Sequence, residues 1–287
     1  MGKDQKISPK NQFNKFLNRE VYFMELVFLG TGGGRYATAK QTRQTGGVIL
    51  KTNKTQIHID PGPGALVHSN KELENPGDTE AVMVSHGHID HYNDAEAIIE
   101  LITQSNNYPG AIFANETVLN GYKDMDKQIS GYHQNLCQEI HNLNENKVIK
   151  YKDLTIKTIE LKHADPKTVG FKISNEDKQF GFWIDTKYRE EFTDFYRGVD
   201  TLVVNCLISR NMDSDKHTSI SDIPRLIREI NPSTLILTHF GKYLLENGKL
   251  EENKDWLEEE CRDLDTDVIF ANDNMKYPGD RSLEDFS

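Results

Sequence analysis

The chain has 287 residues, a length typical of one large domain or two small ones. Its 34 Lys and Arg residues and 45 Asp and Glu residues give a net charge of −11. This balance excludes a protein that coats nucleic acid through a general basic surface, but it leaves room for one local basic groove. The longest apolar runs, such as Leu202–Val204 and Leu235–Leu237, have the length of strands, whereas a membrane span needs about 18 apolar residues.

The first 20 residues are polar and lack the apolar stretch of a secretory signal, so we interpret residues 1–20 as a leader and residues 21–287 as one domain. Cys137, Cys206 and Cys261 are widely spaced and form no CxxC pair. This spacing argues against a disulfide framework or a cysteine zinc site, and it favours a cytoplasmic location.

In chain order, the first half of the domain is predicted to contain four strands and one helix. The strands are expected at Val21–Leu29, Gly47–Lys51, Gln56–Asp60 and Ala81–Ser85, and the helix at Asn93–Gln104. A glycine-rich turn, Gly30–Gly34, follows the first strand. Residues 117–146 are polar and mixed, and their pattern predicts only helix or loop.

Strands dominate the second half of the predicted domain. They are expected at Leu154–Leu161, Thr168–Ile173, Gln179–Ile184, Thr201–Leu207, Thr234–Thr238 and Val268–Ala271, with a helix at Ile223–Ile230. No repeat or linker divides the chain. Two groups of strands with helices between them favour a layered α/β fold in a single domain.

The most informative segment is Ser85-His86-Gly87-His88-Ile89-Asp90-His91. Three histidines and one carboxylate lie within six positions, directly after an apolar strand. Imidazole nitrogens and carboxylate oxygens are ligands that zinc, iron and manganese accept. A chance cluster of this kind is improbable in a chain with 10 histidines, so the segment predicts a metal site.

This motif resembles that of the metallo-β-lactamase superfamily, whose fold is a four-layer αββα sandwich. His163, Asp185 and His239 follow in the expected order, each after a strand-like run. The resemblance implies that one divalent cation is bound by His86, His88 and His163, and another by Asp90, His91 and His239, with Asp185 between them. Zinc is the expected metal and manganese the alternative. Two such cations can hold a hydroxide and neutralise charge on a phosphoryl oxygen.

Within the superfamily, the chain is most similar to the ribonuclease Z-like phosphodiesterases. Phe28–Gly34 resembles the first-strand turn of that branch, and Asp60 its carboxylate that orients the histidine loop. His217 resembles an extra histidine beside the leaving-group oxygen; the alternative is a loop histidine that caps the next helix. The flavodiiron branch has Glu where this chain has His88. Glyoxalase-like thioester hydrolases share the loop and remain an alternative.

Two features bear on the substrate. In tRNA-processing ribonuclease Z a long arm lies between the third histidine and the bridging aspartate, but here only 21 residues, Ala164–Ile184, separate them. The missing arm and the acidic charge favour a smaller phosphodiester than tRNA. The Gly30–Gly34 turn lacks GxGxxG spacing and no helical pattern follows it, which argues against a dinucleotide site. Tyr132 and His133 are expected on the surface, with a lid as the alternative.

The sequence therefore predicts a metal-dependent, nuclease-type phosphodiesterase with two divalent cations. Its expected substrate is RNA, a cyclic nucleotide or a cyclic phosphate. Asp90 is expected to act as general base, and His217 to stabilise or protonate the leaving oxygen. A thioester or lactone hydrolase and an inactive metal-binding module are the alternatives. No membrane partner is expected, and a homodimer is compatible with the sequence.

Overall fold

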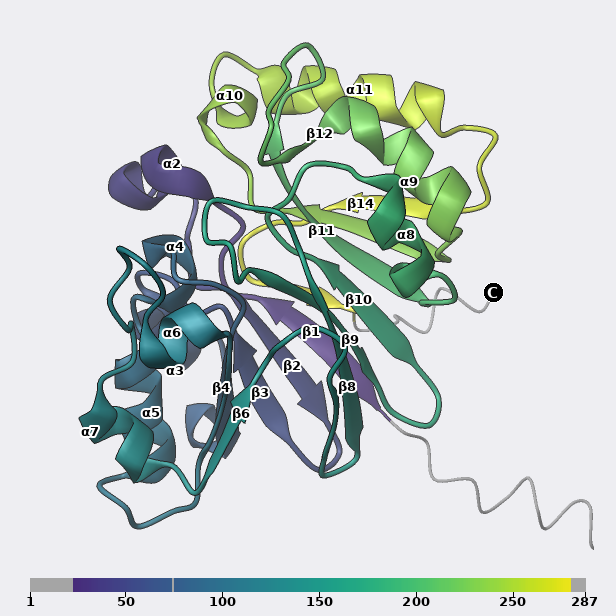
Figure 1. Cartoon of the computed structure of the whole chain (residues 1–287). Coiled ribbons are helices and arrows are strands. Elements are labelled where there is room, and N and C mark those ends of the chain that lie inside the picture. The colour runs from purple at the N-terminus through teal and green to yellow at the C-terminus, as the bar shows by residue number, and fades with distance from the viewer. Residues whose placement is uncertain (1–22, 74, 280–287) are drawn as a thin grey trace, which may run out of the picture.

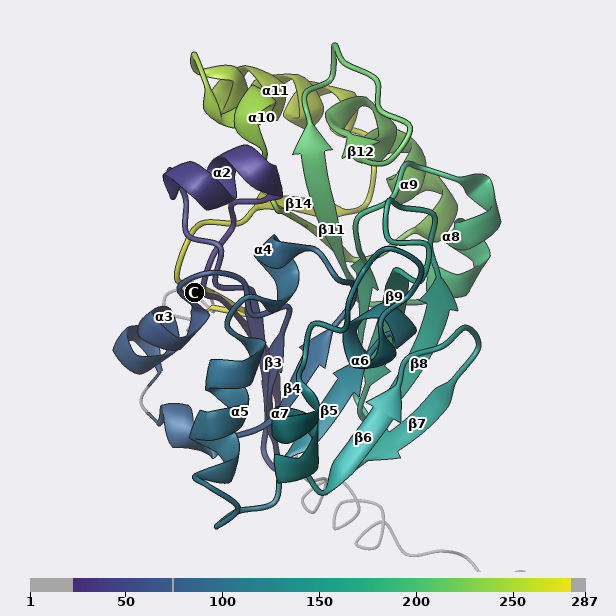
Figure 2. The same ribbon diagram turned by 60° about the vertical axis from the view of Figure 1, so that its left-hand side comes forward.

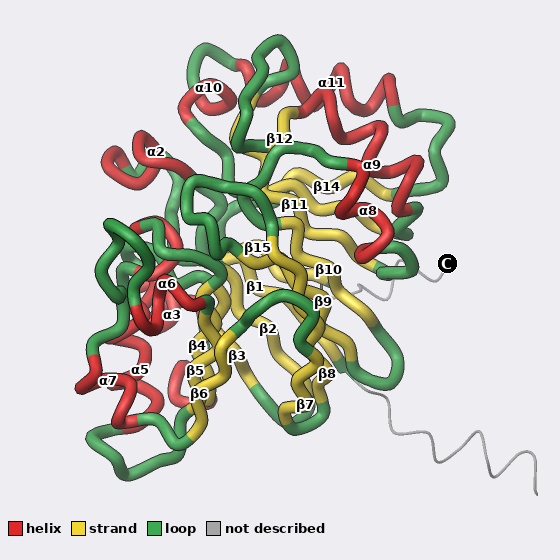
Figure 3. The backbone as a smooth tube through the Cα atoms, viewed as in Figure 1, coloured by secondary structure: helices red, strands yellow, loops and turns green. Residues whose placement is uncertain are grey.

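The structure is a computed structural model that describes residues 23–73 and 75–279. The leader predicted at residues 1–20 lies outside these residues. Two β-sheets pack face to face, and helices cover their outer faces (Figure 1). The described chain is thus a four-layer α/β sandwich, as the sequence predicts, and Figure 3 shows the two strand layers in the centre with helices on either side.

The first sheet has seven strands in the order β15-β1-β2-β3-β4-β5-β6. Their bounds are Met24–Phe28 (β1), Val48–Thr52 (β2), Gln56–Ile59 (β3), Thr79–Val84 (β4), Ala111–Ala114 (β5), Glu139–Asn142 (β6) and Met275–Tyr277 (β15). Strands β3 to β6 run parallel, and β1 runs in the same direction because β2 is antiparallel to both β1 and β3.

The second sheet has the order β14-β13-β11-β10-β9-β8-β7, with β12 paired to β11. Its strands are Val148–Tyr151 (β7), Leu154–Glu160 (β8), Val169–Ser174 (β9), Gln179–Trp183 (β10), Thr201–Ile208 (β11), Thr218–Ser219 (β12), Thr234–Thr238 (β13) and Asp267–Phe270 (β14). Strands β8 and β10 are both antiparallel to β9, so they run in one direction, and β11 and β13 run parallel to β10.

Helices lie on both outer faces and along the edge where many strands end (Figure 2). On the first sheet they are α3 (Ala65–Glu72), α5 (Ala95–Thr103), α6 (Glu116–Asn120) and α7 (Gly131–Leu136); on the second they are α8 (Glu190–Tyr196), α9 (Ile223–Ile230) and α11 (Lys249–Glu260). The edge carries α2 (Gly34–Lys40), α4 (Ile89–Tyr92) and α10 (Lys242–Leu245). Two 3₁₀ turns lie at Pro76–Asp78 and Ile220–Asp222.

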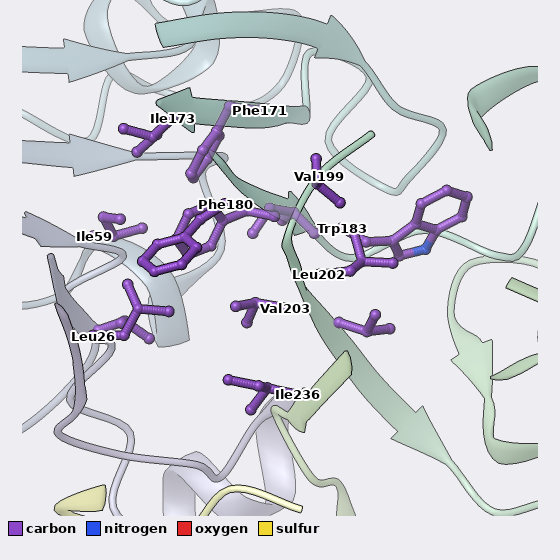
Figure 4. Close-up of a cluster of buried hydrophobic side chains, with 14 of the residues drawn as sticks. Leu26, Ile59, Phe171, Ile173, Phe180, Trp183, Val199, Leu202, Val203 and Ile236 are labelled. Carbon is purple, nitrogen blue, oxygen red and sulfur yellow. The ribbon is translucent and has the colours of Figure 1, made fainter. Parts of the chain in front are cut away.

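The main core fills the space between the sheets. Leu26 and Ile59 of the first sheet face Phe171, Phe180 and Val203 of the second, and all are buried (Figure 4). A second apolar cluster lies under α5, whose buried side chains include Ile98, Ile99 and Ile102. Burial of apolar surface on both faces of the first sheet and between the sheets is the main force holding the layers together.

Helix α9 illustrates how local sequence sets an element. Its buried residues Ile223, Leu226, Ile227 and Ile230 recur at helical spacing, and Pro224 occupies the first turn, where its missing N–H costs nothing. Just before it, Ser219 and Asp222 form a capping box on the 3₁₀ turn. The helix has the bounds that the sequence predicts.

The structure corrects several sequence expectations. A helix, α2, does follow the Gly30–Gly34 turn, although no helical pattern was expected there. Only Ala37 of its seven residues is buried, so it has no apolar stripe. Residues 117–146, expected to be helix or loop, contain α7 and part of α6 but also the strand β6, which that expectation missed. In the described part of the chain, the helices are too short or too polar to cross a membrane.

Candidate metal centre

The strand directions bring the predicted ligands to one edge of the sandwich. His86 follows β4, His163 follows β8, Asp185 follows β10 and His239 follows β13 directly. Because β8, β10 and β13 run in the same direction in the second sheet, their carboxyl ends meet at one edge. The seven residues predicted as ligands, together with His217, form groups whose ligand atoms lie within 4.8 Å of one another.

The first group contains His86, His88 and His163. Nδ1 of His88 lies 3.0 Å from Nε2 of His86 and 3.1 Å from Nε2 of His163. Ligand atoms on a tetrahedral zinc ion, with bonds of about 2.0–2.1 Å, lie about 3.3 Å apart. The spacing of these three nitrogens therefore suits a single cation.

The second group contains Asp90, His91 and His239. Nε2 of His239 is 3.5 Å from Oδ2 of Asp90, and Nε2 of His91 is 3.9 Å from the same oxygen. Both imidazole nitrogens are buried and have no hydrogen-bond partner. Unpartnered buried nitrogens that face carboxylates are costly without a ligand, so this donor set fits a divalent cation.

Asp185 lies between the two groups. Its Oδ2 is 3.7 Å from Nε2 of His163 and 3.7 Å from Nε2 of His91, and its Oδ1 is 3.4 Å from Nε2 of His239. Oδ1 also accepts a 2.9 Å hydrogen bond from the side chain of Asn205 on β11. Its contacts with both groups are those of the bridging position that the resemblance implies.

Asp60, at the end of β3, holds the histidine loop in place. Its Oδ1 accepts from the backbone N–H of Ser85 at 2.7 Å, and its Oδ2 accepts from the Ser85 hydroxyl at 2.7 Å. Oδ2 is also 2.8 Å from Nδ1 of His91. Asp60 therefore fixes the orientation of the His91 ring and presents Nε2 to the second group, as expected from the sequence.

The glycine-rich turn packs against the second group. The backbone N–H of Gly34 donates a 2.7 Å hydrogen bond to Oδ2 of Asp90. His239 has a φ of 63°, in the left-handed region that non-glycine residues rarely adopt. Hydrogen bonds between the neighbouring Phe240 and the turn, to Thr31 O and from Gly33 N, hold that backbone in place.

Burial and the neighbouring charges set the protonation of the centre. Burial raises the pKa of Asp185, but the opposing effect of His239 and His91 is larger. The pKa of Asp185 is therefore well below the usual range for aspartate. Burial lowers the pKa of His91, but Asp60 and Asp90 raise it well above its ordinary value. Burial lowers the pKa of His163 to about 4. The first group is thus neutral at pH 7, as metal-ligating imidazole must be.

His217 lies beside the seven predicted ligands. Its Nδ1 is 3.7 Å from Oδ2 of Asp185, and its side chain is 20% exposed, so solvent can reach it. The next residue, Thr218, is tied to the second sheet: its hydroxyl accepts from Nε1 of the buried Trp183 at 2.9 Å and donates to the carbonyl of Thr186 at 2.7 Å. His217 is therefore held at the rim of the centre.

Tyr132 and His133 lie away from the centre, on α7. Tyr132 is exposed, and His133 contacts Glu96 at 3.0 Å and Glu100 at 3.4 Å, both on α5. This location agrees with the surface interpretation. The three cysteines form no disulfide.

Sequence reasoning missed several residues that support the centre, among them Asn205, Gly33, Thr218 and Asp165. Asn205 has a detectable signal, because it is a polar residue inside the apolar strand Thr201–Ile208. The roles of Gly33 and Thr218 depend on contacts between segments far apart in sequence, which no local pattern reports.

Comparison with known proteins agrees with this geometry. Residues 55–240 match the beta-lactamase superfamily domain model. An uncharacterized protein of Methanocaldococcus jannaschii, MJ1374, is 36% identical over 221 residues, which cover 76% of this chain and 83% of that protein. A ribonuclease Z of Thermococcus sibiricus is 27% identical over 169 residues, 58% of this chain and 53% of that protein.

Solved structures share the same fold. The metallo-β-lactamase fold protein YhfI from Bacillus subtilis has a TM-score of 0.71 and 18% identity, over 88% of this chain and 98% of that one. A diphosphatase of the PhnP family has a TM-score of 0.63 and 16% identity, over 88% of this chain and 97% of that one. With the sandwich and its histidine and aspartate groups, these matches show that the chain belongs to the beta-lactamase superfamily of hydrolases and has the metallo-β-lactamase fold.

Proposed function

We propose that this protein is a metal-dependent phosphodiesterase of the ribonuclease Z-like type that acts on a nucleotide-type substrate smaller than tRNA. His86, His88 and His163 would hold one divalent cation, and Asp90, His91 and His239 the other, with Asp185 shared. Zinc is the expected metal and manganese the alternative. When bound, two such cations polarise a phosphoryl oxygen and lower the pKa of a water to near neutrality.

The residues of the chain supply orientation and proton handling. Asp90 is a buried carboxylate whose pKa is lowered overall: burial raises it, but His91 and His239 outweigh that effect. It is therefore ionised at neutral pH and can accept the proton of an attacking water as general base. The hydrogen bond from Gly34 N–H to Oδ2 fixes the orientation of this carboxylate.

The observation that supports a phosphodiester over a thioester is the position of His217. A phosphodiester with an alkoxide leaving group needs a donor near the leaving oxygen, whereas a thiolate leaves without one. His217 is held near Asp185 by the Thr218 and Trp183 hydrogen bonds and is partly open to solvent. At this place its imidazole can donate a hydrogen bond or a proton to a leaving oxygen.

Two observations favour a small substrate. Residues 164–184, all of them described, contain the antiparallel strands β9 and β10 joined by a turn at residues 175–178, and they form no extended arm. The net charge of −11 also disfavours a large polyanion such as tRNA. A cyclic nucleotide, a cyclic phosphate or a short RNA meets both conditions. A cytoplasmic location and a homodimer stay predictions.

A panel assay tests this proposal. Zinc-loaded protein is incubated with bis-p-nitrophenyl phosphate, 2′,3′- and 3′,5′-cyclic nucleotides, a pre-tRNA and a thioester. We expect turnover of the first two classes, little or none of pre-tRNA, and loss of turnover after chelation. Turnover of the thioester alone would overturn the proposal in favour of acyl chemistry.

A further inference from the structure

Asp165 is a fully buried carboxylate two residues after His163, and it accepts four hydrogen bonds. Its Oδ2 accepts from the backbone N–H of Gly87 at 2.9 Å and from the side-chain amide of Asn115 at 3.0 Å. Its Oδ1 accepts from the hydroxyl of Thr117 at 2.7 Å and from the backbone N–H of Lys167 at 2.9 Å. A buried charge is tolerated only with such complete hydrogen bonding.

These four donors come from three separate segments. Gly87 lies between His86 and His88 in the loop after β4, Lys167 belongs to the segment after β8 that carries His163, and Asn115 and Thr117 begin α6. Asn115 also caps α6 through Val118 N, and its amide donates to Lys167 O at 2.8 Å. Asp165 is therefore the junction at which the two segments of the first histidine group meet.

The space around Gly87 is filled by Thr117 and Met125, next to Asp165. A Cβ at Gly87 would lie 3.0 Å from Cε of Met125, 3.2 Å from Cγ2 of Thr117 and 3.5 Å from Oδ2 of Asp165. A side chain at residue 87 would be in ordinary contact with the carboxylate, but it would crowd Thr117, which itself donates to Asp165, and the end of the Met125 side chain. Glycine at position 87 therefore leaves room for the Thr117 side chain beside Asp165.

Asp60 does not perform this task. It ties Ser85 and His91 to the end of β3, so it fixes one end of the histidine loop and the second group. Its hydrogen bonds do not reach the segment of His163. Asp165 binds the other side of the loop, at Gly87, and joins it to the segment that carries His163.

We propose that Asp165 is a positioning residue that sets the geometry, and therefore the metal affinity, of the group formed by His86, His88 and His163. It binds no metal itself: in the described part of the chain, it belongs to none of the groups that could hold an ion. The inference rests on the proposed allocation of two cations. It predicts that loss of Asp165 affects one cation and spares the other.

The Asp165→Asn substitution tests this role with almost no change in size. An amide offers one oxygen and one NH₂ group, so in either orientation a backbone N–H, of Gly87 or of Lys167, faces a second donor. In one orientation the tie to Gly87 between the two segments is lost, and in the other the bond from Lys167 that holds the segment of His163 is lost. The side chain stays polar and similar in volume, which limits other disturbance.

Two backgrounds separate the metal sites. In His239→Ala, the remaining complete group is His86, His88 and His163; in His163→Ala it is Asp90, His91 and His239. Zinc affinity is measured by competition with a chromophoric chelator. We expect Asp165→Asn to weaken zinc binding about 10- to 100-fold in the His239→Ala background, the usual effect of losing such an outer partner, and by less than about threefold in the His163→Ala background.

Two further variants serve as controls. Gln56 lies at the end of β3 that is remote from Asp60, and its side chain donates a buried 2.6 Å hydrogen bond to Thr79 of β4. Gln56→Leu removes this bond and shows what a general loss of stability does to zinc affinity. We expect it to leave zinc affinity unchanged in both backgrounds. If Asp165→Asn does not fold, Thr117→Val is used instead, because it removes one of the four hydrogen bonds to Asp165. It should lower the zinc affinity in the His239→Ala background by a smaller factor.

The outcomes are distinct. Equal weakening in both backgrounds, or no weakening in either, would overturn the positioning role and leave Asp165 as a residue that only stabilises the fold. A selective loss of one zinc supports the inference even if the panel of substrates shows no phosphodiesterase activity, because that activity is not the quantity measured. A wild-type chain that binds no zinc or manganese would overturn both proposals.

Discussion

The imidazole of His239 fills the space that a side chain at Gly33 would need. A Cβ at residue 33 would lie 2.2 Å from Cδ2 and 2.4 Å from Nε2 of His239. The φ of Gly33 is −145°, which any residue adopts, so the glycine is required by this contact and not by its backbone conformation. The turn that resembles a family motif is thus also a packing surface for a predicted ligand.

From this contact we predict that Gly33→Ala displaces His239. The affinity for the cation proposed to bind Asp90, His91 and His239 should then fall about 10- to 100-fold. The group of His86, His88 and His163 should keep its metal. Gly77→Ala is a matched control, because a Cβ at Gly77 has no atom within 4 Å. Zinc titration of the three chains checks the prediction, and equal affinities in all three would contradict it.

We predict that each chain binds about two divalent cations. Three imidazoles form one group, two imidazoles and a carboxylate form the other, and Asp185 contacts both. Chelation should abolish activity, and zinc or manganese should restore it. Each cation, at 100 times its dissociation constant, should add about 2.7 kcal/mol to the free energy of unfolding. Elemental analysis and thermal melting measure both effects, and an active, folded chain without stoichiometric metal contradicts the prediction.

We predict weak binding of full-length tRNA with a steep dependence on salt. The chain has a net charge of −11, and the segment between His163 and Asp185 is a strand pair without an arm. Any binding then rests on phosphate contacts alone, whose strength falls as salt rises. Fluorescence anisotropy at several salt concentrations measures this. Sub-micromolar affinity for pre-tRNA at physiological salt would reveal a binding groove that this account lacks.

We predict that stability falls as pH is lowered from about 6.5 to about 4, in part because of His58. This residue is fully buried, and burial lowers its pKa to about 4, while the unfolded chain keeps the ordinary value of 6.5. Between these values the unfolded state binds more protons, so acid favours unfolding. This difference in the pKa of His58 contributes about 3 kcal/mol at most to the free energy of unfolding.

His58→Gln keeps a donor for the carbonyl of Gly46, which Nε2 of His58 approaches at 2.7 Å, and cannot be protonated. Denaturant unfolding of the metal-free chains at pH 4.5 and pH 7 compares their pH dependence. The variant should lose about 2–3 kcal/mol less than the wild type over this range. An identical pH dependence would show that His58 does not titrate in this way.

Much of the fold follows from local sequence. Strand β13 and helix α9 have the predicted bounds, because an apolar run and a helical stripe are both strong local signals. Helix α2 was missed because it is short and buries only one residue, and so shows no apolar stripe. Strand β5 was missed because its four residues, Ala111–Ala114, are all buried and show no alternation. The loop Ser85–His91 predicts the centre because its donors are adjacent in sequence.

The supporting contacts could not be predicted in the same way. Asp165 is 78 residues from Gly87, its partner, and the glycine-rich turn meets His239 across some 200 residues of chain. Such contacts depend on how strands of two sheets end at one edge. The resemblance supplied the distant ligands His163, Asp185 and His239, whereas the contacts that hold them appear only in the folded chain.

The central claim is that His217 assists departure of the leaving oxygen of a phosphodiester at a two-cation centre. The most direct test measures kcat of zinc-loaded wild type and His217→Ala on two substrates, one with a poor alkoxide leaving group and one with p-nitrophenolate. Metal content and melting temperature of both chains serve as controls, since loss of a cation or of the fold would also lower kcat. Ser219 and Asp222, and not His217, form the capping box before α9.

The account predicts that His217→Ala keeps both metals and its fold, loses about 10²- to 10⁴-fold in kcat on the poor leaving group, and loses much less on the p-nitrophenyl ester. An unchanged kcat on the poor leaving group would contradict it. That result would remove His217 from the mechanism, and with it the main reason to prefer a phosphodiester to a thioester.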